Sequence, residues 1–183
     1  MSAAVKLLNA AHFHLDEGGL AFLSGGTAAF SEPETSTVRD FLLGEKSERE
    51  VLAAVDFHSW GQLILHQPGW TGDGSADDDV PAELKAEMVE LTDKMVLAIK
   101  QRTGAQYVAS PGSDMYAVGG SADDWLYKEG TDTGLGFAIE LRDTDATGGY
   151  GSFILPASQI EPTTGDVMAS ILAIVDHVLE RHT

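Results

Sequence analysis

The chain has 183 residues, 43% hydrophobic and 22% charged, which suits one folded domain and is too short for two comfortable ones. Its formal net charge of −18 argues against a nucleic-acid-binding protein, because phosphate backbones are bound by clustered Lys and Arg. The absence of Cys excludes disulfides, thiolate metal ligands and cysteine nucleophiles, so any metal must be held by His and carboxylates.

The sequence has no apolar run of the ~20 residues that a membrane span needs. Its first residues, MSAAVKLLNAAHFHLDE, lack the charged start, apolar middle and cleavage site of a secretory signal. We therefore expect no membrane partner and a cytoplasmic location by default, or a secreted protein if an export signal was removed.

The first predicted elements are a helix and a strand. Ser31 as N-cap and Glu34 three residues later form a capping box, with Pro33 in the first turn. The run VLAAVDF (51–57) predicts a buried strand, and GQLIL (61–65) predicts its continuation or a neighbour.

The next segments alternate between loops, helices and strands. QPGWTGDGSADDD (67–79) reads as a loop, and a helix is expected from Pro81 to Arg102 on the helical spacing of its apolar residues. Residues 103–136, rich in Gly, Ser and Asp, predict a long irregular surface segment.

The last segments complete an alternating pattern. GFAIELRD (136–143) predicts a strand, YGSFILP (150–156) a short strand or extended piece, and 164–182 a helix. The expected buried stripe of that helix consists of Val167, Ile171, Ile174, Val175 and Val178. The fold class is therefore predicted as α/β, with a mixed, mainly parallel sheet and flanking helices.

Three residues attract attention as possible site residues. Glu140 interrupts an apolar strand, where burial would raise its pKa and prepare it as a general base; the alternatives are an ion pair with Arg142 or an outward-facing position. His58 follows a strand and is either a hydrogen-bonded core residue or a ligand. Tyr116 lies in a Gly-rich loop and either closes over a pocket or only packs.

Four segments together carry a family resemblance: AFSEPET, DFHSWGQLIL, MYAVGGSADDWLY and FAIELRDTDATGGYGSFILPASQIEPT. Their order and spacing, over residues 24–175, resemble the second half of the catalytic domain of the zinc metallocarboxypeptidases (peptidase family M14, carboxypeptidase A-like). The resemblance implies a carboxypeptidase-like (phosphorylase/hydrolase-type) fold, zinc as cofactor, and the C-terminus of a peptide or protein as substrate.

The same resemblance assigns roles residue by residue. It implies that His58 is the third zinc ligand and that Glu140 activates the zinc-bound water. Ser59 and Trp60 occupy neighbouring substrate-binding positions, with Trp where Tyr is more usual, and Tyr116 matches the mobile tyrosine that caps bound substrate.

The first two zinc ligands of the family come from an H-x-x-E motif a hundred or more residues before that histidine, whereas 57 residues precede His58 here. One such motif occurs, HLDE, from His14 to Glu17, although it sits where the family has its V-D-L-N-R-N-F segment. On that register the substrate-gripping Asn-Arg pair becomes Leu8-Asn9 or Asn9-Ala10.

We therefore expect a single truncated domain over 1–183, with a divergent segment at 1–23 and a family-like part at 24–183. Three possibilities remain open: a carboxypeptidase completed by another chain, a metal-free binding or interaction module, or a zinc site rearranged around His14 and Glu17. The absent half also predicts either a homo-oligomer or a partner chain that covers the truncated side.

Overall fold

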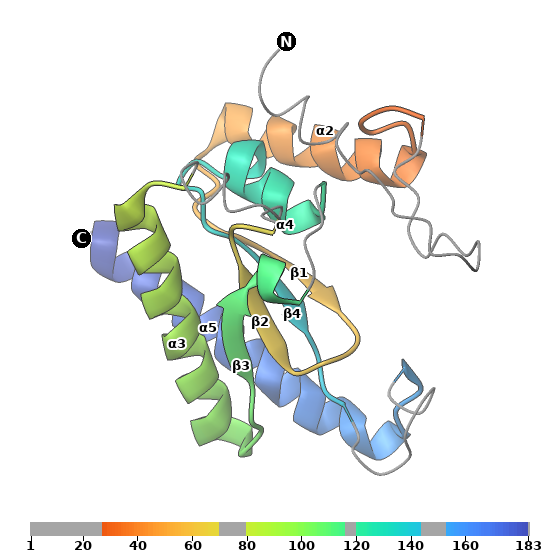
Figure 1. Ribbon diagram of the computed structural model, residues 1–183, viewed down its shortest axis with the longest axis vertical. Coiled ribbons are helices and arrows are strands. Elements are labelled where there is room, and N and C mark those ends of the chain that lie inside the picture. Colours follow the sequence, from red (N-terminus) through yellow and green to blue (C-terminus); the bar gives the residue numbers. More distant parts are fainter. Residues whose placement is uncertain (1–26, 70–79, 116–119, 144–152, 183) are drawn as a thin grey trace.

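The structure, a computed structural model, describes residues 27–69, 80–115, 120–143 and 153–182 (Figure 1). The strands in these ranges are β1 (Ala54–His58), β2 (Leu63–His66), β3 (Val108–Pro111) and β4 (Gly136–Glu140). The long helices are α2 (Pro33–Glu48), α3 (Ala82–Thr103) and α5 (Ile160–His182). Short helical segments are η2 (Gly112–Asp114), α4 (Ala122–Trp125), η3 (Leu126–Gly130) and η5 (Ala157–Gln159). None of the described helices is long and apolar enough to cross a membrane.

The strands form one mixed sheet in the order β1-β4-β2-β3. The β1–β4 and β2–β3 pairs are parallel, and the β2–β4 pair is antiparallel, which confirms the predicted mixed, mainly parallel sheet. The expectation that GQLIL continues or neighbours the first strand was wrong, because β4 lies between β1 and β2. β1 is also only half buried, since it forms an edge of the sheet.

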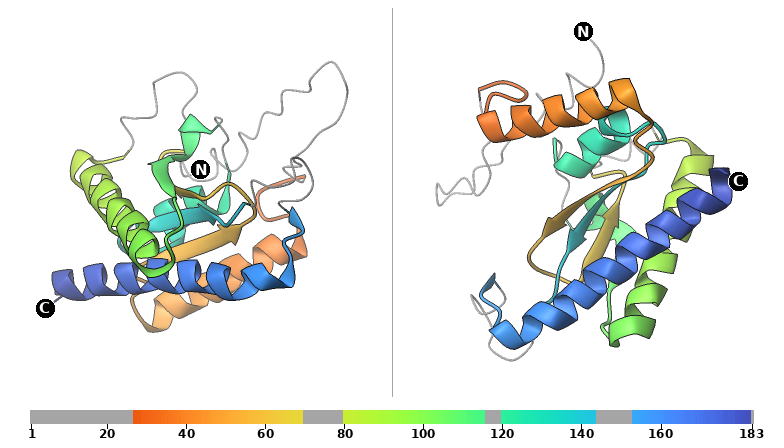
Figure 2. Two further views of the ribbon diagram at one scale, coloured as in Figure 1. Left: turned by 90° about the horizontal axis from the view of Figure 1, so that it is seen from below. Right: turned by 180° about the vertical axis from the view of Figure 1, so that it is seen from behind.

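Helix α3 supplies much of the core, as its sequence pattern predicted. Its fully buried apolar residues Met88, Leu91, Met95 and Ile99 recur at helical spacing and meet Phe137 of β4. α5 runs along the sheet with α3 beside it, and α2 lies beside α4 at one end of the molecule (Figure 2). The core therefore sits between the sheet and the α3–α5 pair.

Helix α5 begins earlier than predicted and is rotated from the predicted orientation. Among the residues of the expected stripe, Ile174 is buried, but Ile171 and Val175 are 37% and 44% exposed. The inward face instead carries polar residues, including Asp166 and His177. Both residues have polar partners on other parts of the chain. A prediction that turns every polar residue of the helix toward solvent therefore assigns the wrong face.

The predicted capping box of α2 was also wrong. The N-cap is Glu32, whose side chain makes no capping hydrogen bond, and Ser31 Oγ donates to the Glu32 carboxylate instead. Pro33 does occupy the first turn, as expected. The helix has no buried residue, and Phe41 is 63% exposed.

In its described parts, 103–115 and 120–136, the segment predicted to be irregular contains more regular structure and more buried residues than expected. It contains β3, α4 and η3, and Trp125, Leu126 and Leu135 are buried. A Cβ on Gly136 would lie 2.6 Å from the Leu126 Cβ, so glycine allows β4 to approach η3. The strand expected at 150–156 is not seen in its described part, 153–156, while 150–152 lie outside the described residues.

Candidate functional site

His58 and Glu140 lie at the ends of two adjacent parallel strands. They are register partners, His58 in β1 and Glu140 in β4. The backbone of the next residue continues this pairing, because Leu141 N donates to His58 O at 2.8 Å. Parallel strands end at the same edge of a sheet, where functional groups commonly gather. The two residues predicted from the sequence therefore lie side by side at one edge of the sheet.

The carboxylate of Glu140 is not fully hydrogen-bonded within the described part of the chain. Its Oε2 is buried and accepts no hydrogen bond within the described part of the chain. Burial raises the pKa of Glu140; nearby His58 lowers this pKa and Asp56 raises it. A carboxylate with an unpaired oxygen and a raised pKa is suited to accept a proton.

The alternative reading of Glu140, an ion pair with Arg142, is wrong. Arg142 points to helix α5, where its Nη2 donates to Asp166 Oδ1 at 2.9 Å and its Nε to Oδ2. Asp166 is fully enclosed and also accepts from Thr103 and Tyr107. The arginine is thus committed to a structural network and leaves Glu140 available.

His58 has a partner that the sequence reading did not assign. Its Nε2 lies 2.8 Å from Asp56 Oδ2, and the side chains of both residues are partly exposed. Residues two apart in a strand share a face, so Asp56 reaches the imidazole from the same strand. A carboxylate in this position orients the ring. In the sequence, the spacing of Asp56 and His58 two positions apart in a predicted strand was the signal that could have revealed this pair.

The loop after β1 wraps around Glu140. The amides of Gly61 and Gln62 both donate to Leu141 O, at 3.1 and 3.0 Å. A Cβ on Gly61 would lie 3.4 Å from Glu140 Cβ, so the loop passes directly beside the carboxylate. Ser59 and Trp60, joined by a cis peptide bond, are exposed in this loop. Both therefore lie where they can contact a molecule bound beside Glu140.

Trp60 also has an aromatic neighbour. Its ring meets the Phe153 ring edge-to-face, with centroids 6.1 Å apart. Phe153 is 66% exposed and Trp60 is 37% exposed, so the pair presents apolar surface near the strand ends. Phe153 had been assigned only to a predicted extended segment. No short-range pattern links it to Trp60, which is 93 positions away.

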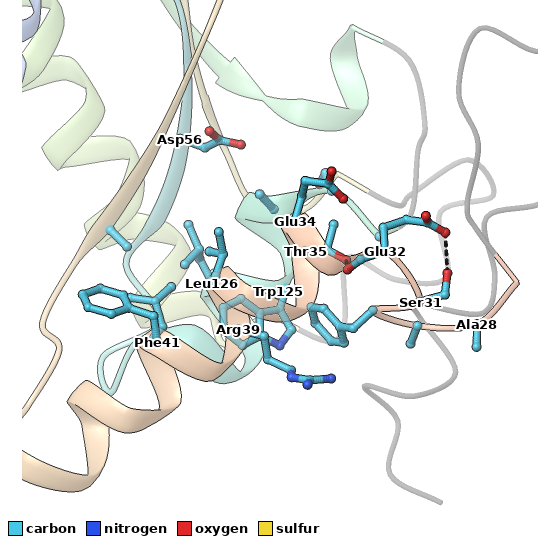
Figure 3. A pocket seen from close by; sticks show the side chains of 18 of the residues that line it. Ala28, Ser31, Glu32, Glu34, Thr35, Arg39, Phe41, Asp56, Trp125 and Leu126 are labelled. Carbon is cyan, nitrogen blue, oxygen red and sulfur yellow. Dashed lines mark hydrogen bonds between the residues drawn. The ribbon is translucent and has the colours of Figure 1, made fainter.

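A cavity of about 600 Å³ opens between α2, α4 and β1 (Figure 3). Its lining is mainly apolar; Phe30 and Trp125 meet edge-to-face at 5.6 Å, and the Arg39 guanidinium lies 4.8 Å from the Phe30 ring centre. Asp56, the partner of His58, belongs to the same lining. The cavity therefore adjoins the candidate site through Asp56.

Two further carboxylates are buried near this region. Gln67 Nε2 donates to Asp123 Oδ2 at 2.9 Å, and Gly120 N donates to Asp124 Oδ2 at 3.3 Å. Burial, with the Asp123 charge as a second cause, raises the pKa of Asp124 to about 7. In the sequence, the visible signal for this buried pair was the doublet of Asp123 and Asp124 before Trp125.

The described residues do not by themselves form a zinc site. Within them, no three His, Asp or Glu side chains come together as a metal-binding group. His58 Nε2 is hydrogen-bonded to Asp56 within the described residues, whereas a catalytic zinc needs three protein ligands. His14, Glu17 and Tyr116 lie outside the described residues, so the structure does not test their predicted roles.

Comparison with known proteins identifies the family of the chain. The model of the zinc carboxypeptidase family matches residues 22–170. Human carboxypeptidase O is 36% identical over 160 residues, which cover 86% of this chain and 38% of that protein. Rat carboxypeptidase A1 is 33% identical over 151 residues, which cover 82% of this chain and 32% of that protein.

Solved structures agree. The bovine thrombin-activatable fibrinolysis inhibitor, solved in complex with tick carboxypeptidase inhibitor, has a TM-score of 0.71 and 28% identity. The similarity covers 89% of this chain and 51% of that one. The chain thus spans less than two fifths of the length of the curated relatives it matches. With most of its own length matched by the family model, the chain belongs to the zinc carboxypeptidase family.

Proposed function

We propose that this chain contributes His58 and Glu140 to the site of a zinc carboxypeptidase that hydrolyses the C-terminal peptide bond of a peptide or protein. The observation that carries the proposal is the pairing of His58 and Glu140 at adjacent strand ends, with one Glu140 oxygen buried and unpaired. The other zinc ligands come from outside the described residues, from a partner chain or a further segment.

The proposed chemistry divides between the residues and the metal. Zinc, held by His58 and two further ligands, would supply a water of lowered pKa and polarise the carbonyl group. Glu140 would act as the general base that accepts a proton from the attacking water and returns one to the leaving amine. Ser59, Trp60 and Tyr116 contact the substrate. Asp56 holds the His58 ring in position.

The test compares the wild-type chain with Glu140→Gln, each combined with the completing polypeptide. We expect stoichiometric zinc in both and release of a C-terminal residue from a blocked dipeptide only in the wild type. Asp93→Asn, which changes an exposed carboxylate on α3, serves as the matched control and should retain full activity. Equal hydrolysis by wild type and Glu140→Gln would refute the assignment of Glu140.

A second candidate is a metal-free relative that uses the scaffold to bind a protein or peptide. The observation that favours it is the absence of a three-ligand group within the described residues. In that case Glu140→Gln leaves binding and biological effect unchanged, and the purified wild type contains no zinc.

A zinc site rearranged around HLDE is tested separately. If His14 and Glu17 act with His58, His14→Ala lowers the zinc content of the isolated chain. Unchanged zinc occupancy in this variant removes that arrangement.

A further inference from the structure

A groove of about 520 Å³ runs between α3 and α5. Thr103 at the end of α3 donates to Asp166 near the start of α5. Glu87 near the start of α3 pairs with Arg181 near the end of α5. The two helices therefore run antiparallel and lie beside each other (Figure 2).

The middle of this groove is apolar and lined by small side chains. Ala98 of α3 and Ala169 and Ala173 of α5 line it, together with Leu172, which is 46% exposed. Alanine side chains leave room for a further helix to approach, because the distance between packed helices depends on the side chains at their contact. Covering this surface would remove apolar area from water, which favours association.

The two ends of the groove carry opposite charges. Arg102 lies at the end where α5 begins, since its Nε would be 4.0 Å from a Cβ on Gly165. Asp176 lies farther along α5, about 16 Å from Gly165 at 1.5 Å per residue. Both side chains are exposed and line the groove, and within the described part of the chain neither makes a hydrogen bond or ion pair.

We propose that this groove is the contact between two copies of the chain, related by a two-fold axis through its apolar middle. A two-fold contact requires a self-complementary surface, because each copy offers the same residues to the other. The axis exchanges the two ends of the groove, so Arg102 of one copy meets Asp176 of the other, twice in each dimer. Leu172 and the alanines supply the apolar centre.

The local charge of the groove suits a second copy better than a strongly charged partner. Its lining contains two cations, Lys94 and Arg102, and two carboxylates, Asp176 and Glu180, so it is formally neutral in a chain of −18. The remaining charges of the two copies repel one another over longer distances. Salt at about 0.15 M limits this repulsion to a reach of about 8 Å, while an ion pair in direct contact is screened less.

The proposed contact is independent of the proposed function. Phe137 and Ile139 of β4 belong to the core that α3 completes. Successive residues of a strand point to opposite faces of the sheet, so Glu140 points away from the face that α3 and α5 cover. The dimer therefore leaves the candidate site open, and failure of either inference does not affect the other.

The experiment is sedimentation equilibrium of the whole chain in about 0.15 M NaCl, where we expect a monomer–dimer equilibrium. Arg102→Glu and Asp176→Arg each bring like charges together at both ends of the contact, and each should weaken dimerisation at least tenfold. Lys100→Glu is the matched control: Lys100 is also a basic residue of the last turn of α3, but it is not part of the groove lining. Its effect should stay below about threefold.

The charge swap is the decisive variant. Arg102→Glu combined with Asp176→Arg keeps the net charge at −18 and rebuilds the same pair in reverse, so it should restore dimerisation to within about threefold of the wild type. Circular dichroism of each variant checks that the fold is kept. A chain that stays monomeric up to millimolar concentration, or a swap that fails to restore a lost dimer, would overturn the proposal.

The apolar centre is tested in the same way. Leu172→Glu places a charge in the contact and should weaken dimerisation at least tenfold. Val89→Glu is its control, because Val89 is 42% exposed on α3 and lies outside the groove lining. A dimer that none of the groove substitutions weakens would use another face of the chain, and the proposal would then be wrong.

Discussion

The buried carboxylates of this chain differ in how completely they are hydrogen-bonded. Asp166 is satisfied by a bidentate arginine, whereas Asp124 and Glu140 each keep one buried oxygen without a hydrogen bond in the described part of the chain. The sequence identified Glu140, because a charge inside an apolar strand is visible locally. It could not pair Arg142 with Asp166 or His58 with Asp56, since side-chain direction decides between neighbouring candidates.

Asp124 predicts a specific dependence of stability on pH. Its pKa is raised from 3.8 to about 7 in the folded chain, so the folded state binds a proton that the unfolded state has lost between these values. The contribution of Asp124 to the free energy of unfolding is greatest below about pH 4. It then falls by about 1.4 kcal/mol per pH unit up to pH 7. Urea unfolding of the wild type and Asp124→Asn from pH 4 to 7 measures the difference.

The wild type should lose stability relative to Asp124→Asn as pH rises across this window. Asp93→Asn, the exposed control, should run parallel to the wild type. A constant difference between wild type and Asp124→Asn would mean that Asp124 is ionised throughout.

The Arg142–Asp166 pair predicts a large structural effect. Asp166→Asn leaves the Arg142 guanidinium without its counter-charge, and we expect the free energy of unfolding to fall by about 3–5 kcal/mol. Asp40→Asn removes a surface pair with Arg39 and should cost about 0–1 kcal/mol. Chemical denaturation gives both values. Similar losses of stability in the two variants would show that the Arg142–Asp166 pair stabilises the fold no more than the surface Arg39–Asp40 pair does.

At the scale of elements, local pattern was sufficient where one face of an element meets the core. α3 was predicted nearly to its ends because its apolar residues recur on one stripe. The strand order was not predictable, because β4 enters between β1 and β2 from almost eighty residues away. α5 was misoriented for a related reason, as its buried polar groups find partners distant in the sequence.

The inward stripe of α3 can be tested against its outward face. Met95 is fully buried, so Met95→Ala should lower the free energy of unfolding by about 2–5 kcal/mol. Leu97, two residues later, is 54% exposed, and Leu97→Ala should change it by less than about 0.5 kcal/mol. Denaturant midpoints with unchanged slopes would establish the contrast, whereas comparable losses would mean that the outer face of α3 is also covered.

At the scale of the whole molecule, family membership and ligand number give different information. The match over residues 22–170 shows the family, while the described residues supply His58 without a three-ligand group. The α5 stripe predicted from the sequence also differs from the described structure, where Ile171 and Val175 are 37% and 44% exposed.

The net charge of −18 makes a prediction that involves every element. Acidic groups repel one another in the compact state, and salt shortens the reach of this repulsion, from about 30 Å at 0.01 M to about 10 Å at 0.1 M. The melting temperature should therefore rise with NaCl at pH 7. Near pH 4.4, where the formal charge vanishes, the same additions should have little effect. Calorimetry at both pH values measures this, and a melting temperature that falls with salt at pH 7 would show that attractive ion pairs outweigh the repulsion.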